Sequence, residues 1–181
     1  MRVISGSVRG RKLKEPVGHK IRPTSDKVKE SVFNIIQFDI EGRNVLDLFA
    51  GSGQYGIEAL SRGAKTVTFV DSASDAVKLV RENVKICGFI ETAIIHGRDA
   101  LRYLDSEEKY DLIFVDPPYD TNLAKKVIER IVEFDKLNIN GIIVCEIGKD
   151  TPTPEVDEPY IMQKEYLYSG VKVVKYTRLA V

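Results

Sequence analysis

The segment Asp116-Pro117-Pro118-Tyr119 combines residue types that can methylate an amine. The exocyclic amine of a purine is a poor nucleophile because its lone pair is delocalised into the ring. The Asp116 carboxylate and the Pro117 carbonyl could accept the hydrogens of that amine and thereby orient its lone pair. The two prolines stiffen the loop, and Tyr119 offers a ring on which an extruded base can stack. The segment therefore predicts methylation of an exocyclic amino group on a nucleobase.

A glycine-rich segment lies upstream, between a predicted strand and a predicted helix. Its glycines, Gly51, Gly53 and Gly56, match the G-x-G-x-x-G pattern, in which the missing Cβ atoms let a ligand approach the backbone. Taken literally, this pattern predicts a dinucleotide. Asp71 then stands where an acid binds the ribose. A nicotinamide-dependent dehydrogenase is therefore one interpretation of this half of the sequence.

Further acids favour S-adenosylmethionine as the cofactor. A carboxylate at Asp47, before the first glycine, would oppose a pyrophosphate but suits the ammonium group of a methionine moiety. S-adenosylmethionine also has a ribose and an adenine, so Asp71 and Asp99 both find a use. Asp99 can equally be the N-cap of a helix that begins at Ala100. Hydride transfer leaves Asp116 unexplained.

Strands alternate with helices from residue 43 onward, and this predicts a doubly wound, mostly parallel sheet with helices on both faces. Ligands of such sheets bind at the carboxyl ends of the strands. A helix is expected from about residue 26, and a capping box from Ser72 to Asp75 is expected to start another. The expected strands are 45–49, 66–70, 93–95, 112–115 and 141–147, followed by an antiparallel hairpin of 160–168 and 171–179.

Charge is unevenly distributed although the whole chain is neutral. Residues 1–29 have a net charge of +7, which leaves −7 for the other 152 residues. This asymmetry predicts a surface that binds a polyanion. We divide the chain into a basic N-terminal hairpin or extended arm, residues 1–23, and a methyltransferase domain, residues 24–181, within one domain overall. The candidate phosphate contacts are Arg9, Arg11 and Lys12.

The N-terminal residues, the hydropathy pattern and the cysteines argue against a secreted, membrane-spanning or metal-binding protein. The N-terminal residues lack the apolar run of a secretory leader, and no window approaches the roughly 20 apolar residues of a membrane helix. Cys87 and Cys145 have no metal-ligand spacing and are expected to be reduced core residues. We expect a cytoplasmic, monomeric protein that needs no metal.

The chain resembles known methyltransferases. The 47–56 and 116–119 segments together resemble class I methyltransferases that modify amino groups of nucleobases. The resemblance extends over almost the whole chain to the RsmD-like guanine-N(2) methyltransferases of bacterial small-subunit (16S) ribosomal RNA. The matching segments are Arg2–Gly6, Arg9–Leu13, Arg22–Glu30, Phe33-Asn34, Asp47–Gly53 and Gly56–Ala64.

This resemblance implies roles for individual residues. Asp71 would bind the ribose and Asp99 the adenine amino group, while Asp116–Tyr119 would hold the target guanine and act in catalysis. The N-terminal hairpin would bind phosphates of ribosomal RNA, free or in an assembling small subunit. The residues assigned to S-adenosylmethionine are Arg22, Thr24, Asp47, Phe49, Gly51, Ser52, Gly53, Asp71, Asp99 and Ala100.

The chain departs from the family at two places, and three alternatives remain besides the dehydrogenase. Gln54-Tyr55 replace a small or apolar pair, and Asp71 stands where Glu is common. The alternative enzyme is an adenine-N(6) methyltransferase acting on DNA or RNA. A glutamine methyltransferase would usually have Asn in place of Asp116. An RNA-binding assembly factor without turnover would not require the acids of the two sites.

Overall fold

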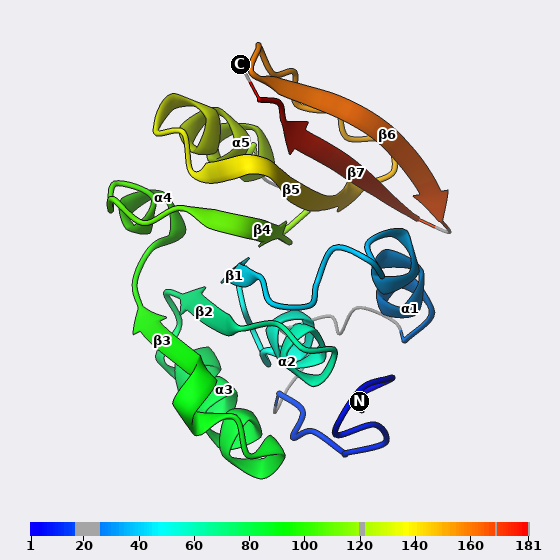
Figure 1. The fold of residues 1–181 in the computed structure, drawn as a ribbon, viewed down its shortest axis with the longest axis vertical. Coiled ribbons are helices and arrows are strands. Elements are labelled where there is room, and N and C mark those ends of the chain that lie inside the picture. Colours follow the sequence, from blue (N-terminus) through cyan, green and yellow to red (C-terminus); the bar gives the residue numbers. More distant parts are fainter. Residues whose placement is uncertain (17–25, 120–121, 169, 181) are drawn as a thin grey trace.

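The computed structural model describes residues 1–16, 26–119, 122–168 and 170–180 (Figure 1). These residues form a seven-stranded sheet in the order β3-β2-β1-β4-β5-β7-β6. Its first five strands are parallel, and β7 runs antiparallel to both β5 and β6. The predicted doubly wound sheet with an antiparallel end is confirmed. The strands are β1 (Asn44–Leu48), β2 (Thr66–Asp71), β3 (Ala93–Gly97), β4 (Tyr110–Val115), β5 (Leu137–Gly148), β6 (Tyr160–Tyr168) and β7 (Val171–Arg178).

Helices cover both faces of this sheet. They are α1 (Asp26–Ile35), α2 (Gln54–Ser61), α3 (Ser74–Cys87), α4 (Ala100–Tyr103) and α5 (Leu123–Glu133). The predicted capping box is wrong, because the described residues show no side-chain cap on α3. Instead Asp71 makes this turn, since its carboxylate accepts the Ala73 amide hydrogen. No helix in the described ranges combines the length and the apolar character that a bilayer-spanning helix requires.

Alternating residues along the strands build two separate cores. On one face Val45, Phe114 and Val144 pack with apolar side chains of α1, α2 and α3. On the other face Leu46 and Val115 pack with α4 and α5. This alternation follows from the twofold side-chain period of a strand. The two cysteines are buried and free, one beside each face, as predicted.

The parallel strands end at one edge of the sheet. Leu48, the last residue of β1, pairs with Val70 in β2 and with Val115 in β4. Val115 in turn pairs with Cys145 of β5. Because these positions are in register, the loops that follow β1, β2 and β4 begin side by side. The glycine-rich loop and the 116–119 segment therefore leave neighbouring strands at the same level.

The N-terminal segment, residues 1–16, folds back on itself and packs on α2. The described residues show one isolated β-bridge here, Arg2 with Lys12, rather than the ladder of a regular hairpin. The buried Glu58 carboxylate of α2 accepts the amide hydrogens of Ile4 and Ser5. Val3 is fully buried in the core below. Backbone hydrogen bonds also pair residues 1–3 with residues 10–13, so the segment is held both by its own pairing and by contacts to the body.

Buried Lys29 of α1 contacts both the N-terminal segment and Glu58 of α2. Its ammonium group donates to the Arg2 carbonyl at 2.7 Å and lies 3.8 Å from the Glu58 carboxylate. Burial lowers the pKa of Lys29, while the charge of Glu58 opposes this shift. A buried charge of this kind needs both a counter-charge and a hydrogen-bond acceptor. The contact therefore fixes the start of the N-terminal segment between α1 and α2.

Replacing Gly56 with Ala is expected to destabilise the protein by about 1–3 kcal/mol, the usual cost of overpacking. A Cβ atom at Gly56 would lie 2.3 Å from Cε1 of Phe69 and 2.8 Å from Cγ1 of Val67. Helix propensity alone would favour Ala by about 1 kcal/mol, so a loss isolates the steric effect. Urea unfolding measures the change. Gly97→Ala is the matched control, since its Cβ would meet Val77 at 3.6 Å. Equal stability of the two variants would contradict this account.

Candidate active site

The glycine-rich loop is a tight turn closed by Asp71. One oxygen of its carboxylate accepts the Gly51 amide hydrogen at 2.9 Å, and the other accepts that of Ala73. Gly53 has φ of 79°, in the left-handed region that favours glycine, and serves as the N-cap of α2. Phe49 also has positive φ, 62°, which is unusual for a residue with a side chain. The turn thus orders the loop before any ligand binds.

Asp47 lies beneath this loop, with a side chain that is only 2% exposed. Its carboxylate accepts the Gly56 amide hydrogen at 2.9 Å, in the first turn of α2. Burial raises the pKa of Asp47 to about 7; the Gly56 hydrogen bond lowers it, and the charge of Asp71 raises it further. The site therefore contains a carboxyl group that gains or loses its proton near neutral pH.

Asn83 connects the loop to the N-terminal segment. Its buried side-chain amide donates to the carbonyls of Ser52 and Lys14, and its carbonyl accepts the Lys14 amide hydrogen at 2.7 Å. The backbone of the loop and that of residue 14 therefore share one side chain of α3. The sequence offers only a weak signal for this contact, a polar residue within an apolar helix stripe.

Asp99 is the N-cap of α4, as one of its two interpretations predicted. Its carboxylate accepts the Arg102 amide hydrogen at 3.1 Å. A hollow of about 600 Å³ opens at this end of β3, lined by Gly97, Arg98, Asp99, Arg102 and Asp105. Ala100 is buried directly behind it. Capping does not exclude a role in ligand binding.

The 116–119 segment follows β4 and turns toward β5. Pro117 is buried, Asp116 and Tyr119 are half-buried, and Pro118 is exposed. The Tyr119 hydroxyl donates to the carboxylate of Glu146 in β5. Beside this residue lies a hollow of about 490 Å³, lined by Tyr119, Gly148, Lys149, Asp150, Thr151 and Gly170.

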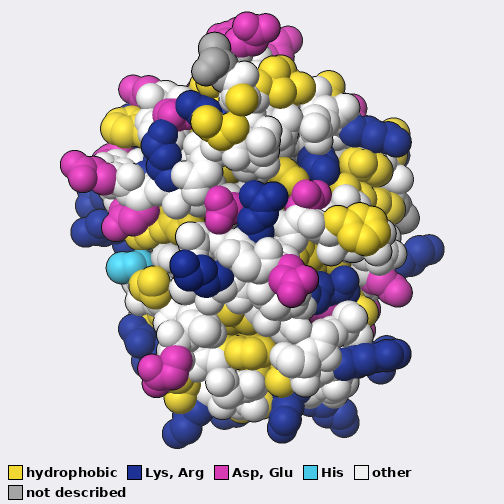
Figure 2. All heavy atoms as spheres, viewed as in Figure 1, with side chains coloured by type: hydrophobic (Ala, Val, Ile, Leu, Met, Phe, Trp, Pro, Cys, Tyr) yellow, Lys and Arg dark blue, Asp and Glu magenta, His cyan; other side chains and the backbone are white. Residues whose placement is uncertain are grey.

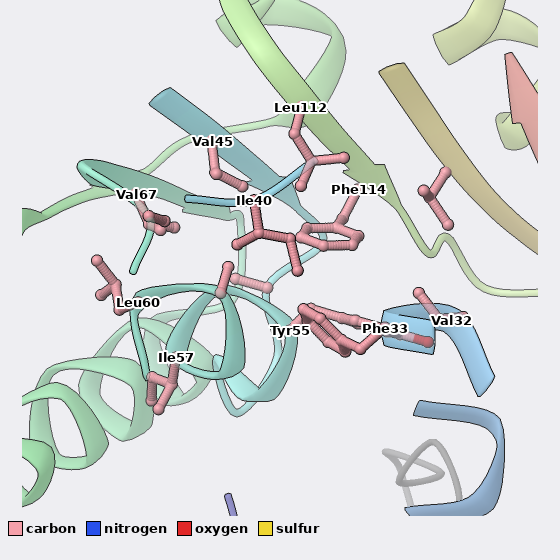
Figure 3. Packing of buried hydrophobic residues seen from close by; sticks show 14 of the residues in the cluster. Val32, Phe33, Ile40, Val45, Tyr55, Ile57, Leu60, Val67, Leu112 and Phe114 are labelled. Carbon is pink, nitrogen blue, oxygen red and sulfur yellow. The ribbon is translucent and has the colours of Figure 1, made fainter. Parts of the chain in front are cut away.

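Tyr55 is turned into the core rather than toward the glycine-rich loop. Its ring stacks on Phe114, with centroids 5.1 Å apart, and on Phe33 (Figure 3). Its hydroxyl donates to the second oxygen of Glu146 at 2.7 Å. Tyr55, one of the two residues of the Gln54-Tyr55 pair that departs from the family pattern, is therefore part of the core. Gln54 is buried, and its Oε1 has no hydrogen-bond partner among the described residues.

Comparisons with known proteins show the family to which the chain belongs. A family model described as conserved hypothetical protein 95 matches residues 1–177. YlbH of Bacillus subtilis is 41% identical over 181 residues, which cover 97% of this chain and 98% of the relative. The ribosomal RNA small subunit methyltransferase D of Haemophilus influenzae is 38% identical over 161 residues, which cover 86% and 83%. The chain belongs to this family, the RsmD methyltransferases.

Solved structures give the same result. The structure of yhhF from Escherichia coli matches with a TM-score of 0.89 at 28% identity, covering 100% of this chain and 99% of that chain. The structure of HI0767 from Haemophilus influenzae has a TM-score of 0.83 at 33% identity, covering 99% and 98%. The RsmD resemblance inferred from the sequence is confirmed, and so is the class I methyltransferase fold.

Within this RsmD-family chain, most of the predicted cofactor residues lie along one edge of the sheet. Asp47, Asp71 and Asp99 belong to β1, β2 and the turn after β3, and the glycine-rich loop lies among them. Arg22 and Thr24 lie outside the described residues. The individual binding roles stay predictions. The described residues contain no group of three metal-ligating side chains.

The predicted RNA contacts lie on the N-terminal segment. Arg9, Arg11 and Lys12 are all exposed at its turn. In Figure 2, Lys and Arg side chains gather around the lower rim of the molecule, at the end where Figure 1 shows the N-terminal segment. The N-terminal segment, which has these three exposed residues, therefore lies at an end of the molecule where many Lys and Arg side chains are visible.

The sequence interpretation missed Glu146. This residue interrupts the apolar run 142–147 of β5 and is only 3% exposed. A charged residue within a buried strand is a signal, because burial of a carboxylate requires hydrogen-bond donors. The donors, Tyr55 and Tyr119, lie 91 and 27 residues away in the chain. Their positions could not be inferred from spacing.

Asp47→Asn is expected to change how stability depends on pH. The folded pKa of about 7 exceeds the unfolded value of about 3.9, so the folded state holds the proton more tightly. The free energy of unfolding should therefore fall as pH rises from about 4 to about 7 and level off above. The difference between the folded and unfolded pKa values limits this loss of unfolding free energy to about 4 kcal/mol. Asn has no carboxyl group to ionise, so the variant does not lose this free energy. It should therefore gain stability relative to the unsubstituted protein as pH rises from about 4 to about 7. Urea unfolding at pH 5 and pH 8 measures it, and parallel profiles would refute the assignment.

Proposed function

We propose that this protein transfers a methyl group from S-adenosylmethionine to the exocyclic 2-amino group of one guanine in small-subunit ribosomal RNA. Family membership supports S-adenosylmethionine-dependent methylation of ribosomal RNA. One observation carries the proposal further. The glycine-rich loop and the 116–119 segment leave the adjacent strands β1 and β4 at the same level, because Leu48 pairs with Val115. A cofactor on the first loop would therefore adjoin a base held by the second.

The residues at the carboxyl edge fit S-adenosylmethionine. This cofactor has a cationic amino-acid end, a ribose and an adenine, and it supplies an activated methyl group when bound. Buried Asp47 would balance the ammonium group, and the buried Gln54 Oε1 is an acceptor without a partner among the described residues. Asp71 would accept hydrogen bonds from the ribose, and Asp99 from the adenine amino group. The hollow at the end of β3 has room for the adenine.

Asp116 and Pro117 would prepare the nitrogen that is methylated. A carboxylate and a carbonyl that accept the two amine hydrogens hold the amine in one orientation. Its lone pair then points toward the methyl group, which lowers the entropic part of the barrier. Tyr119 would stack on the base, and such a stack is worth about 1–3 kcal/mol in single-strand binders. Positioning, more than strong base chemistry, is the contribution of these residues.

Asp116→Ala is expected to abolish methyl transfer while leaving cofactor affinity within a few-fold. The reason is that Asp116 would contact the target amine and not the cofactor. Transfer of labelled methyl groups is measured on unmodified small ribosomal subunits, deproteinised RNA and duplex DNA, and S-adenosylhomocysteine binding is measured by calorimetry. Asp157→Ala, at an exposed aspartate elsewhere, is the matched control. Full activity of Asp116→Ala would sink the proposed chemistry.

The identity of the labelled nucleoside separates the alternatives. Label in 2-methylguanosine at one RNA position supports the proposal. Label in 6-methyladenine would keep the mechanism and overturn the target. Cofactor binding without label in any substrate would favour an RNA-binding assembly factor. Stabilisation by NAD and not by S-adenosylmethionine in a thermal-shift screen would return the dehydrogenase interpretation. A ribosomal substrate also implies that the protein acts in the cytoplasm.

Replacing Arg9, Arg11 and Lys12 together with Ala is expected to weaken RNA binding and flatten its salt dependence. Each phosphate contact on a single strand contributes about 0.7 to the slope of log K against log salt, so three lost contacts should remove about 2. RNA affinity is measured between 50 and 300 mM salt. A triple Ala variant of Lys125, Lys126 and Lys164, exposed on α5 and β6, removes the same charge elsewhere. Equal slopes for the two variants would show that the N-terminal segment has no special role.

A further inference from the structure

Glu146 is a buried carboxylate whose two oxygens face in different directions. One accepts the hydroxyl of Tyr55 and the other that of Tyr119. It extends from the same face of β5 as Val144, toward the core that contains α1 and α2. A carboxylate accepts hydrogen bonds but donates none when ionised. Two phenol donors therefore satisfy it in one arrangement, with both hydroxyl hydrogens pointing inward.

The two tyrosines differ in what else holds them. Tyr55 is buried and stacks on both Phe33 and Phe114 (Figure 3), so packing alone fixes its ring. Tyr119 is half-buried at the hollow after β5, where its Cβ lies about 4 Å from the Cβ position that Gly148 would have. Tyr119 also packs against this core, but part of its surface stays exposed beside the hollow. The hydrogen bond to Glu146 adds a polar contact between Tyr119 and the packed core.

We propose that Glu146 is a positioning residue, which fixes the ring of Tyr119 against the target nucleotide in the hollow between Tyr119 and residues 148–151. This inference rests on the proposed function, since it presumes that a base stacks on Tyr119. The hollow, about 490 Å³, lies within the range of small-molecule sites. Lys149 on its rim has an exposed side chain suited to a neighbouring phosphate.

The physical reason is preorganisation. Stacking requires the plane of the ring to be set before the base arrives, and a misplacement of about 1 Å costs about 100-fold in rate. The hydrogen bond from the Tyr119 hydroxyl to the Glu146 carboxylate holds the far end of the ring. Held at the hydroxyl by Glu146 and at the backbone by the rigid Pro117-Pro118 pair, Tyr119 has both ends constrained. The Glu146 carboxylate would therefore influence the substrate only indirectly, by fixing the orientation of the Tyr119 ring.

The test is a double-mutant cycle between Glu146→Gln and Tyr119→Phe. Gln keeps the shape of the side chain but presents an amide donor where one phenol needs an acceptor. Phe keeps the stacking ring and removes its hydroxyl. Each single variant is expected to lower kcat about tenfold, with the KM for RNA and the affinity for S-adenosylhomocysteine within threefold. The double variant should lose no more than either single one, because both remove the same contact.

Two controls separate positioning from stability. Tyr176→Phe removes a buried phenol hydrogen bond on the other face of the sheet, to the Pro154 carbonyl, and it is expected to lower the melting temperature while kcat stays within threefold. Glu91→Gln removes an exposed glutamate far from the site, and it should change neither quantity. If Glu146→Gln does not fold, Tyr119→Phe still decides, since an unchanged kcat overturns the inference.

The remaining outcomes separate this inference from the proposed function. An unsubstituted protein that methylates guanine, with Glu146→Gln folded and equally active, overturns the positioning role and leaves the function standing. Independent, additive losses in the cycle would likewise overturn it, because the two residues would then act separately. An unsubstituted protein that binds cofactor yet transfers no methyl group to any nucleic acid overturns the proposed function itself.

Discussion

The hydrogen bond from the Gly56 amide to the buried Asp47 carboxylate is the interaction on which the site depends. It attaches the first turn of α2 to the end of β1. All eight residues of α2 are buried, so the helix lies inside the molecule rather than on its surface. Helix N-termini favour negative charge, which offsets part of the cost of burying this carboxylate. The glycine-rich loop, which precedes α2, is fixed by the same contact.

Each remaining part of the site is attached to α2 at a different residue. Tyr55 leads to Glu146 and from there to Tyr119. Glu58 and Ser61 bind the backbone of the N-terminal segment. Gly56 lets the helix approach β2 closely enough for these contacts to form. A helix covered on its outer side needs polar groups there for the covering backbone, because buried amides must be paired. This explains why α2 has a charged residue at a fully buried position.

How much was predictable from the sequence follows from the range of each interaction. Apolar runs ending in Asp or Gly located the strands, and the rule for parallel sheets then aligned their ends, so the 47–56 and 116–119 segments could be expected together. The start of α3 was misjudged because Ser72 and Asp75 match a local capping pattern, whereas Asp71 makes the turn. The contacts of Glu58 with residues 4 and 5 span more than 50 residues. No local pattern encodes such partners.

The distinction between local and long-range contacts also applies to the two sides of the proposed site, the cofactor side and the substrate side. The proposed cofactor side is built from backbone turns, which the glycines and Asp71 determine locally. The proposed substrate side depends on side chains that meet only in the fold, because Glu146 accepts hydrogen bonds from both Tyr55 and Tyr119. A loop gains rigidity when a buried group on a strand holds it, and sites on rigid elements are more precise than sites on loops. Strand β5 thus contributes to the proposed substrate side through Glu146, and its last residue, Gly148, lines the hollow. The aromatic stack of Phe33, Tyr55 and Phe114 extends that support to α1, which follows the N-terminal segment in the chain.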